Sequence, residues 1–264
     1  MNRIEARMEK LKEQGKKAFI TYMTAGLPDM KKTEELIHVQ EQAGVDVIEL
    51  GIPFSDPVAD GPVIQDASYR SIQNGTNLTK IFTSMKRVRE DGAQVPVVFM
   101  MYYNTVMHYG IDAFVDKCAE CGVDGLIIPD LPFEEQGELR QSIEANENAP
   151  ILIELVSPVS KDRIPMILNQ ARGFVYCVSQ MGVTGNGAHF HDHIKEYLAE
   201  VKRVSKIPVM MGFGIRNAED VLPLKEFIDG AIVGSHFIRL LEGSDYSAQV
   251  VDDYIREFKS ELNA

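Results

Sequence analysis

The sequence is poor in cysteine, in long apolar runs and in positive charge. Its three cysteines, Cys118, Cys121 and Cys177, are too few for a disulfide framework, which agrees with a reducing compartment. No apolar run approaches the roughly 18 residues of a membrane span. The first 17 residues are too charged for a signal peptide. We therefore expect a cytoplasmic protein.

Acidic residues outnumber basic ones by 39 to 27, which gives a net charge of -12. Such a field repels nucleic acid and anionic lipid at long range, so neither is an expected partner. An anionic small substrate would have to be bound by local donors, such as backbone amides at helix N-termini.

Short apolar or β-branched runs alternate with longer amphipathic segments, as in parallel strands joined by helices. The expected strands span residues 18–23, 45–51, 95–102, 125–130, 150–156, 173–179, 207–213 and 230–235. Eight such units in about 250 residues match the size of a (β/α)8 TIM barrel. No linker or composition break divides the chain, so we predict a single α/β domain over residues 1–264.

Helices are expected between these strands, including one at residues 218–227. An extra N-terminal helix, residues 2–14, would cap the bottom of the barrel, and a short extra helix would begin at Ser235 after the eighth strand. In such a barrel the chemistry lies at the C-terminal ends of the strands and in the loops that follow them.

Glu49 lies near the end of the second expected strand. Alternation puts Val47, Glu49 and Gly51 on one face and the apolar Ile48 and Leu50 on the other. If the wholly apolar face meets the helices, Glu49 points into the barrel mouth. Burial there would raise its pKa toward the range useful for proton transfer. The alternative is a structural carboxylate bonded to backbone amides.

The loop that follows, IPFSDPVADGP, contains three prolines and two aspartates, so it is stiff and acidic. Asp56 and Asp60 are both candidates for catalysis. The spacing alone does not choose between them, because Asp-Gly at 60 and 61 is also an ordinary turn signal.

Glycine-bearing segments follow the last three expected strands, at residues 182–187, 212–216 and 234–235. Each can bring backbone N–H groups close to a ligand. Loops seven and eight with a short extra helix form the usual phosphate site of such barrels, so we predict one here. The GFG of residues 212–214 is not a dinucleotide fingerprint, since it lacks the third glycine and the later acidic residue.

Metal and Schiff-base chemistry have weaker support. His189, His191 and His193 could serve a zinc-dependent aldolase, but the run immediately precedes a helix, where polar residues cap and solvate. The CxxC of residues 118–121 lies in a helical stretch without a second pair. No expected strand carries a lysine at its top, and Lys206 precedes the seventh strand. We therefore expect no metal.

The segment IELGIPFSDPVADGPVIQ, residues 48–65, closely resembles the signature of tryptophan synthase α chains. Supporting stretches are MMYYN, LIIPDLPFEE, GVTG, GFGI and GS, so the resemblance runs from about residue 18 to about residue 240.

The resemblance implies retro-aldol cleavage of indole-3-glycerol phosphate to indole and glyceraldehyde 3-phosphate, with no metal or organic cofactor in this chain. It assigns proton transfer to Glu49 and the contact with the ring nitrogen to Asp60. It places the phosphate at Gly185, Gly214, Gly234 and Ser235. The other expected substrate contacts are Tyr22, Tyr102, Ile153, Tyr176, Thr184 and Phe213.

The resemblance also implies an α2β2 complex, in which indole passes through a tunnel to a β chain that carries pyridoxal phosphate. Pro53, Asp56 and Pro57 lie in the loop that resembles the β-facing segment of the family, and Thr184 would meet Asp60 when the loops close. One departure is visible. Gln180 stands where well-known members have a lid arginine, so the resemblance does not carry over the contacts of that arginine.

Two other functions compete with this one. A different phosphosugar barrel, such as an indole-glycerol-phosphate synthase or an epimerase, would place lysines or metal-binding histidines at the strand tops, which lack them here. A regulatory subunit without activity would have no need to keep both Glu49 and Asp60.

Overall fold

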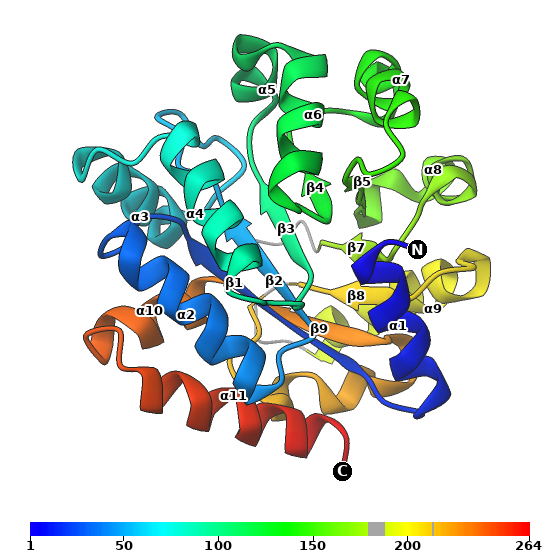
Figure 1. The fold of residues 1–264 in the computed structure, drawn as a ribbon. Coiled ribbons are helices and arrows are strands. Elements are labelled where there is room, and N and C mark those ends of the chain that lie inside the picture. Colours follow the sequence, from blue (N-terminus) through cyan, green and yellow to red (C-terminus); the bar gives the residue numbers. More distant parts are fainter. Residues whose placement is uncertain (179–187, 213) are drawn as a thin grey trace.

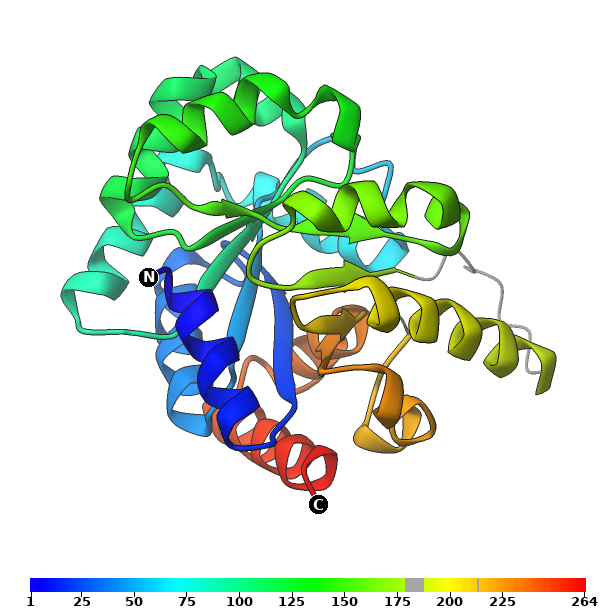
Figure 2. The same ribbon diagram turned by 90° about the vertical axis from the view of Figure 1, so that its right-hand side faces the viewer.

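The computed structural model describes residues 1–178, 188–212 and 214–264, except for the side chains of residues 161 and 188–192. Helices surround a central set of strands (Figure 1, and turned by 90° in Figure 2). The α-helices are α1 Arg3–Glu13, α2 Met30–Ala43, α3 Pro62–Gln73, α4 Leu78–Glu90, α5 Tyr103–Tyr109, α6 Ile111–Cys121, α7 Gly137–Ala145, α8 Ile164–Gln170, α9 Ala188–Val204, α10 Ser235–Gly243 and α11 Ala248–Leu262. The strands are β1 Ala18–Thr24, β2 Val47–Gly51, β3 Val97–Met100, β4 Gly125–Ile127, β5 Ile151–Leu152, β6 Glu154–Val156, β7 Val175–Cys177, β8 Val209–Met211 and β9 Gly230–Val233. The short 3-10 helices are η1 Phe133–Glu135, η2 Pro158–Arg163, η3 Ala218–Asp220 and η4 Leu222–Phe227.

The strands of the described residues form one sheet in the order β5-β4-β3-β2-β1-β9-β8-β7-β6. Every neighbouring pair is parallel. The two strands at the ends of this order, β5 and β6, are halves of one extended segment that is interrupted at Ile153. Because β5 pairs with β4 and β6 pairs with β7, this segment closes the sheet into a barrel. The predicted (β/α)8 fold is confirmed, and the predicted strand at 150–156 corresponds to both β5 and β6.

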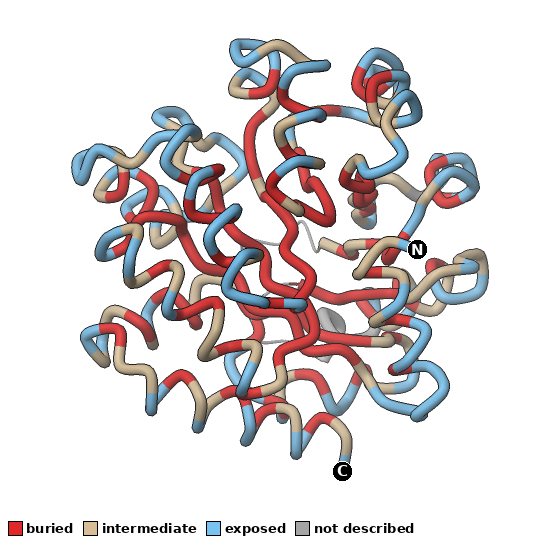
Figure 3. The backbone as a smooth tube through the Cα atoms, in the orientation of Figure 1, coloured by how far each residue is buried: buried red, intermediate tan, exposed pale blue. Residues whose placement is uncertain are grey.

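Side chains along the strands alternate between the inside of the barrel and the layer of helices. Ile20 and Val47 belong to an inner apolar cluster, whereas Phe19 and Ile48 pack in the larger cluster between the strands and the helices. Buried residues follow the strands, and exposure is concentrated on the outer sides of the helices (Figure 3). Glu49 is two residues from Val47, so it shares the inward face, as predicted.

Local signals in the sequence fix how the chain passes from helix to strand. Asp29 caps the start of α2, where its side chain accepts a hydrogen bond from the backbone N–H of Lys32 at 2.8 Å. Gly44 ends the same helix with a φ of 96°, a left-handed conformation that glycine adopts without a steric penalty. The chain then turns directly into β2, which carries Glu49.

Both predicted extra helices are present. Ile4, Met8 and Leu11 of α1 are buried and join the inner cluster, so α1 closes the N-terminal end of the barrel. Helix α10 begins at Ser235, directly after β9. None of the helices in the described parts of the chain is both long and apolar enough to cross a membrane.

Two local predictions are wrong. Residues 218–227 form the 3-10 helices η3 and η4 instead of an α-helix. Pro223 lacks an amide hydrogen and its ring obstructs the preceding turn, so an α-helix cannot run through this segment. The histidine run does not precede a helix: α9 begins at Ala188, so the run lies in its first turns.

Candidate active site

Glu49 is a buried carboxylate without a hydrogen-bonding or ionic partner in the described part of the chain. It lies on β2 in register with Tyr22 of β1, and it is 1% exposed. Its Oε1 atom is buried and accepts no hydrogen bond from a described residue. Burial raises the pKa of Glu49 to about 8, and the nearby charge of Asp60 acts in the same direction. Glu49 therefore binds and releases a proton near neutral pH, which suits an acid-base catalyst.

Asp60 is held in place by Tyr102, which follows the neighbouring strand β3. The hydroxyl of Tyr102, just after β3, donates to Oδ2 of Asp60 at 2.8 Å and accepts from the backbone N–H of Ala59 at 2.9 Å. The ring of Tyr102 stacks on Phe54 at 5.1 Å, which supports the loop from its other side. Burial raises the pKa of Asp60, while the hydrogen bond from Tyr102 lowers it. The loop thus presents one carboxylate in a fixed position.

Two tyrosines inside the barrel each lie over a glycine at or just after the end of a neighbouring strand. A Cβ atom on Gly51 would lie 2.0 Å from Oη of Tyr22, and one on Gly212 would lie 2.3 Å from Cε2 of Tyr176. Any side chain at either glycine would displace the ring, so these positions require glycine. Burial raises the pKa of both phenols, with further increases from the charges of Glu49 and Asp60. Both hydroxyls therefore stay protonated at neutral pH.

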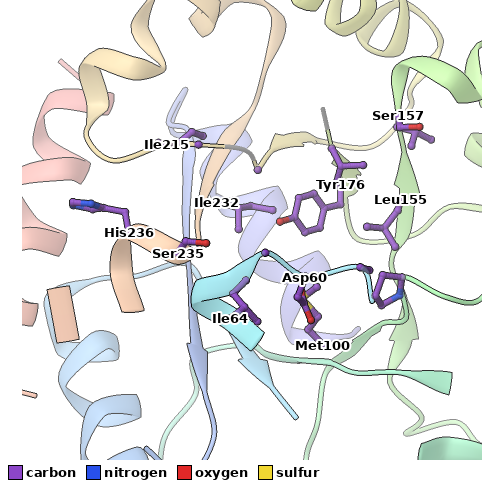
Figure 4. Close-up of a pocket in the computed structure, with 18 of the residues that line it drawn as sticks. Asp60, Ile64, Met100, Leu155, Ser157, Tyr176, Ile215, Ile232, Ser235 and His236 are labelled. Atoms are coloured by element: carbon purple, nitrogen blue, oxygen red, sulfur yellow. The ribbon is translucent and has the colours of Figure 1, made fainter. Parts of the chain in front are cut away.

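A cavity of about 810 Å³ opens at this end of the barrel and includes Asp60 and Tyr176 in its wall. In Figure 4, Tyr176, Leu155, Ile232 and Asp60 surround one space. The apolar part of the lining comes from Ile64, Met100, Leu155 and Ile232. A flat apolar ligand with a few polar groups fits such a lining. Glu49 is not itself a lining residue. It lies on β2 two residues before Gly51, whose neighbour in β3 is Met100 of the cavity wall.

Another part of the cavity is suited to an anion. It is lined by Gly214, which has a φ of 63°, and by Gly234 and Ser235 at the start of α10. The first N–H groups of a helix lack helical partners and carry partial positive charge, so they bind phosphate without a neighbouring lysine. Arg216 and Arg239 also line the cavity and add positive charge at its edge.

Most of the expected contact residues with described positions lie at this end of the barrel, but three of them, Tyr22, Tyr102 and Ile153, do not line the cavity. Tyr176, Gly214, Gly234 and Ser235 line it directly. Ile153 is buried in the inner cluster with residues of α1 and is not a lining residue. Leu155, the next inward residue along the segment, takes that place, and strict alternation from Ile153 would have identified it. Gln180, Thr184, Gly185 and Phe213 lie outside the described residues.

The expected partner-facing loop is at the surface. Asp56 is exposed, whereas Pro53 and Pro57 are half-buried. Val58 beside them has 82% of its surface exposed, which is high for an apolar residue.

The residues that could indicate metal or Schiff-base chemistry do not form a second site in the described parts of the chain. In the described residues, no group of three or more His, Cys, Asp or Glu side chains is placed to hold a metal. The side chain of His193 is 82% exposed, and those of His189 and His191 lie outside the described residues. Cys118, Cys121 and Cys177 are buried free thiols. Lys206 lies at the opposite, N-terminal end of the barrel, against a different cavity.

The geometry defines a (β/α)8 barrel in which one carboxylate, Asp60, lines a cavity with a phosphate-type cradle and a second, Glu49, is buried near it. Comparisons with known proteins identify the family. A model of the tryptophan synthase alpha chain family matches residues 8–263. The tryptophan synthase alpha chain of Lachnospira eligens is 67% identical over 264 residues, with 100% of both chains covered. That of Alkaliphilus metalliredigens is 46% identical, with 92% of this chain and 90% of the relative covered.

Solved structures of tryptophan synthase alpha chains have the same fold. Tryptophan synthase subunit alpha from Legionella pneumophila superimposes with a TM-score of 0.90 at 33% identity, covering 99% of this chain and 98% of that one. A chain of Mycobacterium tuberculosis tryptophan synthase gives 0.88 at 30% identity, covering 100% and 99%. The chain belongs to the tryptophan synthase alpha chain family. Enzymes of this family are carbon–carbon lyases of tryptophan biosynthesis that cleave indole-3-glycerol phosphate and pass the indole to a β subunit.

Proposed function

We propose that Glu49 carries the proton in the cleavage of indole-3-glycerol phosphate and that Asp60 stabilises the charged indole ring. The observation that carries this proposal is the buried, unpaired carboxylate of Glu49, whose pKa of about 8 leaves it protonated at neutral pH beside a second acid. A carboxylic acid in this state can donate a proton and take one back within a single turnover.

The proposed cleavage adds one proton to the indole ring and removes one from the side-chain hydroxyl. Glu49 donates its proton to carbon three of the indole ring, and the positive charge that develops on the ring nitrogen is stabilised by the carboxylate of Asp60. The Glu49 carboxylate then removes the proton of the side-chain hydroxyl. The carbon–carbon bond breaks, its electrons return to the ring, and an aldehyde forms. The products are indole and glyceraldehyde 3-phosphate, and Glu49 has its proton again.

The substrate is proposed to lie with its ring near Asp60 and its phosphate at α10. Gly185, Gly214, Gly234 and Ser235 would bind the phosphate through neutral donors, and Tyr22, Tyr102, Tyr176 and Phe213 would surround the ring and the glycerol chain. Leu155 replaces Ile153 in this proposal because it lines the cavity. Thr184 would meet Asp60 when the loops close.

The complex is proposed to be an α2β2 assembly in the cytoplasm, with this chain as a single domain. Pro53, Asp56 and Pro57 would face the β chain, and the exposure of Val58 beside them supports an interface at this loop. Pyridoxal phosphate would belong to the β chain alone. The cleavage in this chain needs only proton transfer and charge stabilisation, which its own side chains can supply.

The test follows indole release from indole-3-glycerol phosphate by the purified chain, alone and with a β chain. We expect Glu49→Gln to lower kcat about 10³-fold, since general acid-base groups contribute about 10² to 10⁴-fold. The wild-type rate should also fall above about pH 8, where Glu49 loses its proton. Glu154→Gln is the matched control, because Glu154 is buried but interacts with Arg140 and Gln136 on the helix side. Comparable rates for wild type and Glu49→Gln would refute the mechanism, and no indole release by wild type with its β chain would refute the function.

A further inference from the structure

A second cavity, of about 390 Å³, opens at the N-terminal end of the barrel. It lies between α1, the turn that leads into β1, the end of α9 and the residues before β8 and β9. Its floor is apolar and reaches the buried Met8 of α1 and Met210 of the barrel interior. We call this cavity the floor site.

The rim of the floor site is strongly basic in a chain whose net charge is -12. It carries five lysines and one acid: Lys12, Lys16, Lys17, Lys202, Lys206 and Asp229. Lys202 pairs with Asp229, and Lys17 donates to the backbone oxygen of Ile228 at 2.7 Å. No ion pair is described for the other three lysines in the parts of the chain that the structure covers. The rim therefore holds more positive charge than its own carboxylate can balance.

Helix ends explain only part of this charge. Lys12 lies in the last turn of α1 and Lys202 in the last turn of α9, where cations offset the helix dipole. Lys16, Lys17 and Lys206 follow the helices and have no such role. Burial lowers the pKa of Lys17, and repulsion from Lys202 and Lys225 adds to this effect against the attraction of Asp229. An anion at the rim would relieve this repulsion.

We propose that the floor site binds a small organic phosphate, with its apolar body on Met8 and Met210 and its phosphate among the rim lysines. Lysine binds phosphate as a point charge with three donors, so several lysines with free ends suit a dianion. The volume of the site lies within the range of small-ligand pockets and accommodates one aromatic ring. The site is separate from the catalytic cavity, which opens at the other end of the barrel.

Methionine methyl groups report on both cavities in one sample. Met8 and Met210 line the floor site, and Met100 lines the catalytic cavity. We would titrate the chain, labelled with 13C at its methionine methyls, with phenyl phosphate and follow each signal by NMR. We expect saturable shifts of Met8 and Met210, with affinity at least fivefold higher than for uncharged benzyl alcohol and reduced by added salt.

Charge reversal at the rim provides the decisive comparison. Lys16→Glu with Lys206→Glu should weaken the response of Met8 and Met210 at least fivefold and leave that of Met100 unchanged. Lys10→Glu with Lys86→Glu makes the same change in net charge at exposed positions outside the site. Equal effects of the two double variants, or no shift of Met8 and Met210, would overturn the proposal. Binding of inorganic phosphate as tight as that of phenyl phosphate would show an adventitious ion and would also overturn it.

Discussion

The two ends of the barrel differ in how their carboxylates are paired. At the N-terminal end, Asp46, Asp124 and Asp229 each directly precede a strand. Each accepts a hydrogen bond from a backbone N–H of the neighbouring strand and pairs with a lysine or arginine. At the C-terminal end, Glu49 and Asp60 have no cationic partner among the described residues.

The difference affects the protonation of these acids. Burial raises the pKa of Asp124, but Arg89, Arg3 and the N–H of Val97 all act to lower it. For Glu49, burial and Asp60 both raise the pKa and nothing opposes them. A buried carboxylate with donors is fixed as a charged link between elements, whereas one without donors keeps its proton and can transfer it.

The largest expected effect on stability comes from removing a carboxylate at the N-terminal end. Asp124→Ala leaves the guanidinium of Arg89, only 10% exposed, without its 2.7 Å partner. We expect a loss of about 3 to 5 kcal/mol in the free energy of unfolding, as for other broken buried pairs. Chemical denaturation measures this change. Asp91→Ala, at an exposed position, should stay within about 0.5 kcal/mol, and an equal effect of both would remove the distinction.

The second expected change in stability is a gain, and it comes from replacing Glu49 at the C-terminal end of the barrel. Glu49 binds protons more tightly in the folded state, with a pKa of about 8, than in the unfolded state, with a value of 4.5. The wild type therefore loses stability as the pH rises between these values, and Glu49→Gln does not. We expect the stability of the variant relative to wild type to rise by up to about 1.4 kcal/mol per pH unit in this window. Denaturation at a series of pH values measures it, and a difference independent of pH would show that Glu49 is not buried as a neutral acid.

A smaller effect, on the rate of indole release, should follow from removing the Tyr102 hydroxyl that donates to Asp60. Tyr102→Phe keeps the ring that stacks on Phe54 but loses the hydroxyl between Asp60 and Ala59. Loss of a hydrogen bond to a charged group costs about 1.5 to 3 kcal/mol, so kcat/KM for indole release should fall about tenfold or more. Tyr69→Phe, on an exposed side chain, is the control. An unchanged rate in Tyr102→Phe would mean that the loop holds Asp60 without it.

The smallest loss of stability should come from replacing Arg3, the more exposed partner of Asp124 at the N-terminal end of the barrel. Arg3 also pairs with Asp124, at 2.9 Å, but its side chain is 39% exposed. Water screens such a pair, so Arg3→Ala should cost less than about 1 kcal/mol in a denaturation experiment. A loss as large as that of Asp124→Ala would show that exposure does not separate the two arginines.

The alternation of side chains in β2 was readable from the sequence because residues two apart share a face of any strand. Together with the expectation that the wholly apolar face meets the helices, this predicts that Glu49 points into the barrel. It did not set the height of a residue along the barrel axis, which depends on how neighbouring strands are staggered. For that reason the sequence predicts Ile153 as a cavity residue, whereas Leu155, on the same face but two residues later, lines the cavity.

The choice between Asp56 and Asp60 shows a second limit. Spacing within the loop does not distinguish them, and only the family resemblance favours Asp60. In the structure the two differ because Tyr102, 42 residues away in the sequence, donates to Asp60. Asp56 is exposed, and its described partner is the adjacent Ser55.

The order of the strands and of most helices, the inward direction of Glu49, the stiff acidic loop and the glycines at the strand ends can be predicted from the amino-acid sequence, because they depend on periodicity and local chemistry. Which carboxylates have partners, where the cavities open and which lysines meet at the floor site follow only from the folded chain. These properties depend on residues far apart in the chain, since closure of the sheet brings them together and burial then sets their charge.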